Sequence, residues 1–469
     1  MSMSALQAAQ PSMVSRLRPA APIPHTEKMG FLRYIAETGK NPLTALGAEA
    51  FEERVIAADV LGQKSILLND PEAIKRVLLD NAANYVKSKP FLKIIKPALG
   101  NSVLMTEGAE WRFQRRTSSP MFQMRHIADC APSMAAAVNE MLARWDSLPE
   151  ASEIDVASEM MRATYDIISR TMFSNDVTLP FEKMAAAFET YLDTLGRAGL
   201  ATFFLPGWVP TPDRLKGGKA LAFLRREIGG IVARRRAQLA ADPSRVPDDL
   251  LTLLLMARDP EGGAVFGDAE VLDNVMTFIF AGHETTANAM TWTFYLLSQF
   301  PEWEGRVADE AVRVLDNREA AAGDMPSLQT ARMVIEESMR LYPPAPFIAR
   351  RALAADTLCG LNVTPGTSVT ASPWVVHRHK LLWNDPDYFD PTRFAPGARE
   401  RIHRFAYIPF GGGPRICIGM AFAMQEAMII LATVARRFRL ALAPDQTVEP
   451  HARVTLRPKN GLRMSLARR

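Results

Sequence analysis

The segment from Asp268 to Phe300 constrains the fold most strongly, because it is long, apolar and free of proline. At about 1.5 Å per residue, one helix over this segment would be roughly 50 Å long. A helix of that length and polarity is expected to run through the middle of a large domain. Elsewhere apolar residues recur mainly at helical spacing and strand-like runs are short. The chain is therefore predicted to be mainly helical with small sheets.

Local patterns predict several further elements. Residues 54–68 are typical of a hairpin that turns near Gly62, and Asp70-Pro71 is expected to cap and start a helix. Helical patterns cover 125–174 and 180–196, and a last helix is expected from just after Cys417 to about Phe438. The apolar, Pro- and Gly-containing stretch 203–210 suits either a connector packed on the core or a flexible hydrophobic entrance, and the sequence does not decide between them.

The composition is that of a globular protein. Of 469 residues, 48% are hydrophobic and 23% charged, with a net charge of +4, which excludes the disordered, collagenous and disulfide-rich classes. The pI near 8.9 comes without long basic blocks, so nucleic acid is not an expected partner. Cys130, Cys359 and Cys417 are too few and too scattered for a disulfide framework, so reduced, intracellular thiols are expected.

No repeat or low-complexity linker divides the chain. Residues 1–25 are predicted to be an extended lead-in, and 26–469 one domain. The first 26 residues lack acidic residues and carry Arg16 and Arg18, a weak likeness to a transit peptide, but four prolines favour the lead-in. No stretch near the start has the apolar length of a membrane span or signal peptide. We therefore expect a cytoplasmic monomer without a membrane anchor.

Residues 410–419, Phe-Gly-Gly-Gly-Pro-Arg-Ile-Cys-Ile-Gly, carry the chemistry. The glycines allow backbone amides to approach a cofactor, and the start of the next helix favours a thiolate. The pattern Phe-x-x-Gly-x-Arg-x-Cys-x-Gly resembles the haem-binding loop of the cytochrome P-450 family. Five such fixed positions would match by accident less than roughly once in ten thousand chains of this length.

This resemblance implies a single, triangular prism-like haem domain with a long central helix. It also implies haem b, with Cys417 as the axial thiolate ligand of the iron and with Phe410, Gly411 and Gly419 in the loop around the cofactor. A thiolate on haem iron promotes cleavage of bound dioxygen.

The sequence Ala281-Gly282-His283-Glu284-Thr285-Thr286 resembles the oxygen-activation groove of the same family. Thr285 follows Ala281 by four residues, so its hydroxyl can bond that carbonyl and open the helix locally. The resemblance implies proton delivery by Thr285 and Glu284, and places Ala281 beside the cofactor.

Four cationic or aromatic residues resemble the partners of the haem propionates. They are Trp111, Arg115, Arg350 and Arg415. Arginine suits this role because its planar fork binds carboxylates through two hydrogen bonds. Glu337 and Arg340, three apart on one helix face, resemble the Glu-x-x-Arg motif of the family, with Arg393 as the third member of a buried structural network.

Apolar residues near these motifs are expected to form the substrate pocket by the same resemblance. They are Phe91, Ile94, Val103, Leu104, Phe278, Phe347 and Ile348, together with Ala281 and Thr285. A lipophilic substrate is therefore expected, of the fatty-acid or terpenoid kind.

The expected function is that of a haem-thiolate monooxygenase that inserts one atom of O2 into such a substrate. The chain continues for only 52 residues after Cys417 and has no Gly-x-Gly-x-x-Gly fingerprint after a strand. Electrons, ultimately from NAD(P)H, are thus expected from a ferredoxin or flavodoxin with its reductase, docked on the Cys417 side.

Two other functions remain open. A peroxide-driven peroxygenase would use the same haem without redox partners, but it has less need of Glu284 and Thr285. A haem sensor or carrier would lack catalysis, and no appended signalling or DNA-binding segment favours it.

Overall fold

The computed structural model describes residues 17–27, 29–60, 62–174, 181–197 and 211–469. The helices in these ranges are α1 (Phe31–Lys40), α2 (Pro71–Lys75), α3 (Lys89–Leu99), α4 (Gly108–Ser118), α5 (Met124–Asp129), α6 (Ala131–Asp146), α7 (Val156–Phe173), α8 (Phe181–Arg197), α10 (Pro212–Ala241), α11 (Leu250–Met256), α12 (Asp268–Gln299), α13 (Pro301–Leu315), α14 (Gln329–Leu341), α15 (Pro373–Val376) and α16 (Met420–Arg437).

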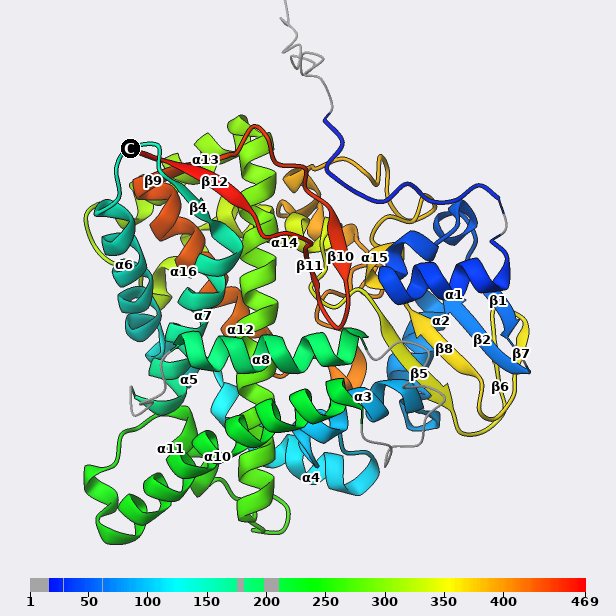
Figure 1. The fold of residues 1–469 in the computed structure, drawn as a ribbon, viewed down its shortest axis with the longest axis horizontal. Helices are drawn as coiled ribbons and strands as arrows, with labels where there is room; N and C mark the ends of the chain where they lie inside the picture. The colour runs from blue at the N-terminus through cyan, green and yellow to red at the C-terminus, as the bar shows by residue number, and fades with distance from the viewer. Residues whose placement is uncertain (1–16, 28, 61, 175–180, 198–210) are drawn as a thin grey trace, which may run out of the picture.

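The strands form small sheets at the sides of the helical body (Figure 1). They are β1 (Val55–Val60), β2 (Gln63–Leu68), β3 (Tyr85–Lys87), β4 (Glu153–Asp155), β5 (Ile348–Ala352), β6 (Asp356–Leu358), β7 (Leu361–Val363), β8 (Ser368–Ala371), β9 (Phe438–Leu442), β10 (Pro450–Ala452), β11 (Leu456–Pro458) and β12 (Arg463–Arg468). The largest sheet has the order β1-β2-β8-β5-β3, and β4-β12-β9, β10-β11 and β6-β7 form the others. The prediction of a mainly helical chain with small sheets is confirmed.

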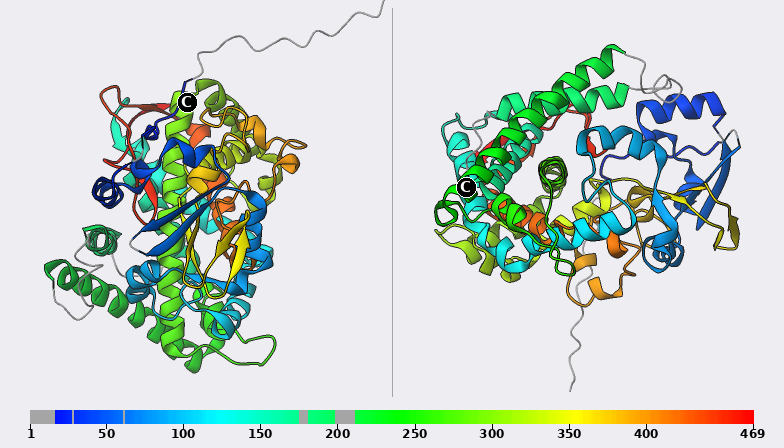
Figure 2. Two further views of the ribbon diagram at one scale, coloured as in Figure 1. Left: turned by 90° about the vertical axis from the view of Figure 1, so that its right-hand side faces the viewer. Right: turned by 90° about the horizontal axis from the view of Figure 1, so that it is seen from below.

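Helix α12 runs through the middle of the molecule, as the sequence predicts (Figure 1, and end-on in Figure 2, right). The Glu270 carboxylate accepts a hydrogen bond of 2.8 Å from the Gly267 amide, which satisfies one donor at the start of the helix. Helices α7, α10, α14 and α16 pack around it. Most of its side chains from Val271 to Leu297 are buried, because neighbouring elements pack around most of the rod.

The predicted hairpin and the helix after it are both confirmed. Strands β1 and β2 pair antiparallel, from Val55 opposite Leu68 to Val60 opposite Gln63. The Asp70 carboxylate then accepts hydrogen bonds from the amides of Glu72 and Ala73, which starts α2. Strand β2 continues the sheet by pairing parallel with β8.

The helical stretch predicted for 125–174 is broken into α5, α6 and α7, and the short strand β4 precedes α7. Strand β4 pairs with β12 near the C-terminus, and this long-range contact gives the sequence no local signal. Helices α8 and α10 pack against each other and cross α12 (Figure 1). The apolar stretch 203–210 lies outside the described residues.

Residues 17–24 of the predicted lead-in form neither helix nor strand. Ala20 nevertheless packs on the helical body, since its amide donates to Tyr295 and its carbonyl accepts from the Tyr342 hydroxyl. The division into a lead-in and one domain stays a prediction. Among the described residues, no helix combines the length and hydropathy needed to cross a membrane.

Candidate functional site

The loop before α16 is shaped by glycines. Gly411 and Gly413 have φ angles of 73° and 67°, in the left-handed region that favours glycine. A Cβ on Gly413 would also overlap the carbonyl oxygen of Leu78, so the loop packs against this neighbour without a side chain between them. The Cys417 amide closes the loop by donating to the Phe410 carbonyl at 2.9 Å.

Cys417 ends this loop with an accessible side chain, while protein surrounds it on its other sides. This burial raises the pKa of the thiol, and the Gly419 amide and the Arg115 guanidinium act in the opposite direction. The donors therefore favour a thiolate but do not outweigh desolvation. A metal cation at the thiol would supply the missing positive charge, so the donor set fits a metal-bound thiolate.

Helix α4 brings Trp111 and Arg115 to the cysteine loop. Arg115 Nη1 donates to the Ile416 carbonyl at 3.0 Å, next to Cys417. The Arg415 guanidinium carbon lies 4.1 Å from the centre of the Trp111 ring, a cation–π contact. Three of the four predicted propionate partners thus meet at one side of the loop.

Arg350 of β5 joins this group through electrostatic interactions with Glu107 and Arg415. Lys87 of β3, which the sequence analysis missed, donates to Glu107 at 3.1 Å and to the Thr106 carbonyl at 3.3 Å. Burial lowers the pKa of Lys87 to about 8, aided by Arg415. Burial likewise lowers the pKa of Arg415 to about 10.

Glu107 is the one carboxylate that interacts with Lys87, Arg350 and Arg415 within the described part of the chain. Its ion pair with Arg415 leaves the cationic charge of the group in excess. Buried, uncompensated cations are costly, and an anionic ligand would relieve that cost. The group therefore suits the carboxylates of a haem.

The middle of α12 has a surface that neighbouring side chains leave open. Ala281 is exposed and Thr285 partly so, while Ile279, His283 and Thr286 are buried. The Thr285 hydroxyl donates to the Ala281 carbonyl at 2.7 Å, the local bond expected from their spacing. Gly282 backs onto Ile168 of α7, where a Cβ would lie 3.4 Å from the isoleucine Cδ1.

Glu284 is buried and its carboxylate accepts a hydrogen bond of 2.6 Å from the hydroxyl of Thr455, in the turn between β10 and β11. Asn288 Nδ2 lies 3.4 Å from the same hydroxyl. Thr455 was not among the predicted site residues, because no local pattern connects a C-terminal turn to α12.

Glu426 of α16 is a second missed acid. It is 2% exposed and is hydrogen-bonded to Thr286, the neighbour of Thr285. Burial raises its pKa to about 8, which the Thr286 bond partly offsets. The one sequence signal is that this glutamate lies within a mostly apolar helix.

Among the predicted pocket residues, Phe278 reaches the cysteine loop through Phe122. Its ring packs edge-on against Phe122 at 5.3 Å, and a Cβ on Gly419 would lie 3.9 Å from the same phenylalanine. Ile348 borders the loop from the other side, 3.9 Å from a Cβ on Gly411.

The other predicted wall residues differ in exposure. Leu104 is 37% exposed, whereas Val103 is 7% exposed. The half-buried members are Phe91, Ile94 and Phe347.

Glu337 and Arg340 form a fully buried pair with two hydrogen bonds, of 2.6 and 2.7 Å. Arg393 Nε lies 3.6 Å from Glu337, so all three predicted members are together. Arg340 also donates to three backbone carbonyls, those of His377, Pro386 and Tyr388. The network ties α14 to the segment that precedes the cysteine loop.

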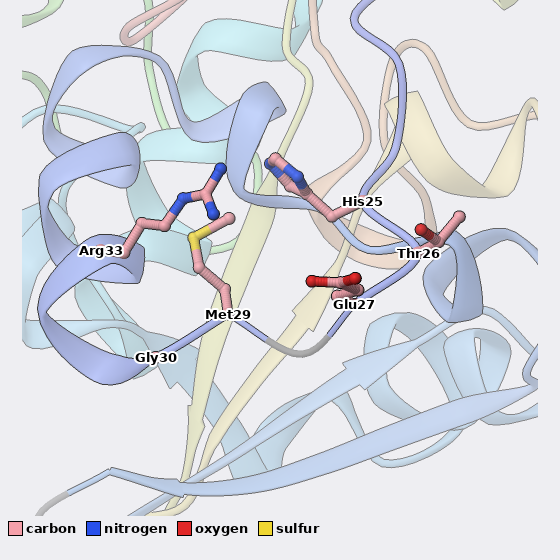
Figure 3. Close-up of a pocket in the computed structure, with 6 residues that line it drawn as sticks. All are labelled: His25, Thr26, Glu27, Met29, Gly30 and Arg33. Atoms are coloured by element: carbon pink, nitrogen blue, oxygen red, sulfur yellow. The ribbon is translucent and has the colours of Figure 1, made fainter.

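A polar pocket of about 200 Å³ lies at the start of α1 (Figure 3). It is lined by His25, Thr26, Glu27, Met29, Gly30 and Arg33. None of the predicted site residues lines it, so it is separate from the cysteine loop.

A family model described as cytochrome P450 matches residues 49–464. The chain is 34% identical to pentalenene oxygenase of Streptomyces avermitilis over 85% of this chain and 87% of the relative. It is 33% identical to cyclooctat-9-en-7-ol 5-monooxygenase of Streptomyces melanosporofaciens over 87% of each chain. The crystal structure of the cytochrome P450DA heme domain superposes with a TM-score of 0.83 at 23% identity, covering 96% of this chain and 98% of that one.

Proposed function

The chain belongs to the cytochrome P450 family, and we propose that this haem monooxygenase hydroxylates a terpenoid or a lipophilic molecule of similar shape. Family membership brings haem with a cysteine thiolate ligand and O2 as the co-substrate. Within this frame, the substrate class, the electron donor and the role of each residue are our proposals.

Cys417 would hold the iron, and Arg115, Arg350, Arg415 and Trp111 would hold the propionates. We add Lys87 to this set because it is buried in the same group of cations. Haem bound through a thiolate supplies reductive activation of O2, by which one oxygen atom enters a C–H bond and the other leaves as water. The balance requires two electrons and two protons from outside the substrate.

The protein's own part in the chemistry is to deliver protons and to exclude other reactions. Thr285 has a hydroxyl on the open surface of α12, held by the Ala281 carbonyl. Glu284 is the nearest acid along the chain and lies behind it in buried surroundings. We assign proton delivery to this pair, with Thr285 at the reacting side.

Ala281 and Leu104 each expose an apolar side chain, and this exposure is the observation that carries the substrate proposal. Phe278 lies about two turns before Thr285 on the same helix and adds an aromatic wall. Such walls bind through burial of apolar area, at about 25 cal/mol per Å². The names of pentalenene oxygenase and of the cyclooctat-9-en-7-ol enzyme support a terpenoid in preference to a fatty acid.

Electrons would come from NAD(P)H through a ferredoxin or flavodoxin and its reductase. Arg112 and Arg125 are exposed on α4 and α5, the helices that flank the cysteine loop, and Met420 next to the loop is 39% exposed. Exposed cations around an apolar spot suit an acidic protein carrier. The Michaelis constant for the carrier should rise with salt, and Arg112→Glu should raise it further.

An optical titration of the ferric haem protein tests the substrate proposal. Cyclic terpene hydrocarbons, straight-chain fatty acids and steroids would be compared as ligands. The expected result is a low-spin to high-spin shift with the terpenes at the lowest concentration, followed by an oxygenated terpene when electrons and O2 are supplied. A shift with fatty acids alone would overturn the terpenoid assignment.

The same preparation distinguishes a peroxygenase. We expect turnover with NAD(P)H, redox partners and O2 to exceed turnover with hydrogen peroxide. Faster turnover with peroxide alone would show that the protein is a peroxygenase.

A further inference from the structure

Residues 100–107, which connect α3 to α4, form a strap that is fastened at both ends. At one end the Asn101 amide donates to Asp273 at 2.8 Å, and the Val103 amide donates to Asn274 at 2.9 Å. At the other end the Thr106 carbonyl accepts a bond of 2.8 Å from Arg415. The strap thus spans from α12 to the cationic group beside the cysteine loop.

Apart from Asn101 at its start, the exposed side chain of the strap is Leu104 in its middle. Leu104 is 37% exposed, while Ser102, Val103 and Met105 are between 0% and 7% exposed. Because the backbone on either side is held by hydrogen bonds, the place of the Leu104 side chain depends on the side chains that accept those bonds. Two of these are Asp273 and Asn274, which are both buried.

Asp273 also binds an element outside the strap. Arg225 of α10 donates to its second carboxylate oxygen at 2.7 Å and to the Ala98 carbonyl at 3.3 Å. Gly100 has a φ of 53°, and a Cβ there would overlap the Asp273 carboxylate, so the backbone approaches this acid as closely as glycine allows. One carboxylate therefore connects α10, α12 and the strap.

Gln114 of α4 completes the fastening. Its amide oxygen accepts from Asn274 at 3.0 Å, and its amide nitrogen donates to the Asn101 carbonyl at 2.5 Å. Both backbone groups of Asn101 are thereby bound by side chains. Bonds of this kind within a buried network are costly to break singly, because the remaining partner loses its own bond.

We propose that Asp273 and Asn274 are positioning residues for substrate selection, which fix Leu104 against the ligand, and that the Arg225–Asp273 pair links the strap to α10. The contact of Leu104 with substrate rests on the proposed function. The fastening of the strap does not, and it is tested separately.

Hydrogen exchange of the haem-loaded protein tests the fastening directly. Asp273→Asn and Arg225→Met should speed exchange in a peptide covering 99–107, and Asn274→Leu should do so at Val103. The matched control is Arg236→Met, because Arg236 pairs with Asp268 and so links the same two helices without touching the strap. Unchanged exchange in the three test variants would overturn the proposal.

Binding of two azoles tests the consequence for ligands without assuming a substrate class. Imidazole is small, and 4-phenylimidazole extends away from the iron that both compounds bind. A strap that adopts several positions spends less time in the position that allows binding. Arg225→Met should therefore weaken the binding of 4-phenylimidazole by about fivefold to tenfold. The affinity of Arg225→Met for imidazole should stay within about twofold of the wild-type value, and Arg236→Met should change the affinity for neither azole.

An equal loss of affinity for both azoles in Arg225→Met, or no loss of affinity for either, would overturn the positioning role. Failure of the terpenoid titration alone would overturn only the proposed substrate class. Arg225→Met is the safer variant for folding, since its side chain is 31% exposed.

Discussion

The hydroxyl of Thr455 donates a hydrogen bond of 2.6 Å to Glu284, across 171 positions of sequence. The acid before Thr285 is therefore held by the turn between β10 and β11. Val454, beside Thr455 in this turn, is 41% exposed. This hydroxyl thus helps to orient the carboxylate assigned to proton delivery.

Replacement of this hydroxyl should uncouple the enzyme. In Thr455→Val the buried Glu284 carboxylate loses a donor, which costs about 1–3 kcal/mol and frees the carboxylate to turn. We expect the yield of product per NAD(P)H consumed to fall several-fold, with a changed solvent isotope effect. Thr455→Ser keeps the donor and should restore the product yield and the solvent isotope effect to their wild-type values. Wild-type coupling in Thr455→Val would contradict this role.

Thr285→Ala should retain haem and the substrate-induced spectral shift, because the lost hydroxyl is bonded only locally to Ala281. Without that hydroxyl, protons reach the reacting side less effectively, so electrons should be diverted to hydrogen peroxide. The measurement is peroxide formed per NAD(P)H, with Thr285→Ser as the control. Unchanged coupling would remove Thr285 from the mechanism.

Glu426 should make stability fall as the pH rises. Burial raises the pKa of this carboxyl to about 8, so the folded protein binds a proton that the unfolded chain releases near pH 4. The stabilisation that this proton provides is complete below about pH 4 and is lost as the pH rises to about 8. Over this range the free energy of unfolding falls by at most about 1.4 kcal/mol per pH unit. Glu426→Gln should flatten this slope in melting temperatures measured from pH 5 to 8.5. Parallel curves for the two proteins would contradict the assignment.

The Glu337–Arg340 pair should be the most sensitive ion pair that we describe. Both side chains are fully buried, so Glu337→Gln leaves Arg340 with uncompensated charge and should cost about 3–5 kcal/mol. The control is Arg332→Met, since Arg332 is 63% exposed and 3.8 Å from Glu336, and should cost less than about 1 kcal/mol. Thermal unfolding and haem retention measure both effects. Equal stability of the two variants would contradict a buried network.

Local sequence patterns predicted α12, the cysteine loop and the Glu337–Arg340 pair. Their defining residues are only a few positions apart in the sequence. Within α12, for example, Thr285 bonds to Ala281 across four residues. The roles of the site residues remain predictions, but their grouping is visible in the contacts of Arg415 with Trp111 and of Arg115 with Ile416.

The missed residues depend on tertiary packing. Asp273 meets Asn101 across 172 positions, and Arg415 meets Glu107 across 308. Lys87 is in a strand of three residues, too short for a periodic signal. Only the packing of distant elements makes these side chains neighbours, so no local spacing could have identified them.

The spectrum of the reduced carbon monoxide complex shows whether Cys417 provides the thiolate ligand of a haem. The wild-type protein and the Cys130→Ala and Cys359→Ala variants should show the red-shifted Soret band of a thiolate-ligated haem, and Cys417→Ala should lose it. If the red-shifted band survives in Cys417→Ala, another residue ligates the iron and the account of this site is wrong.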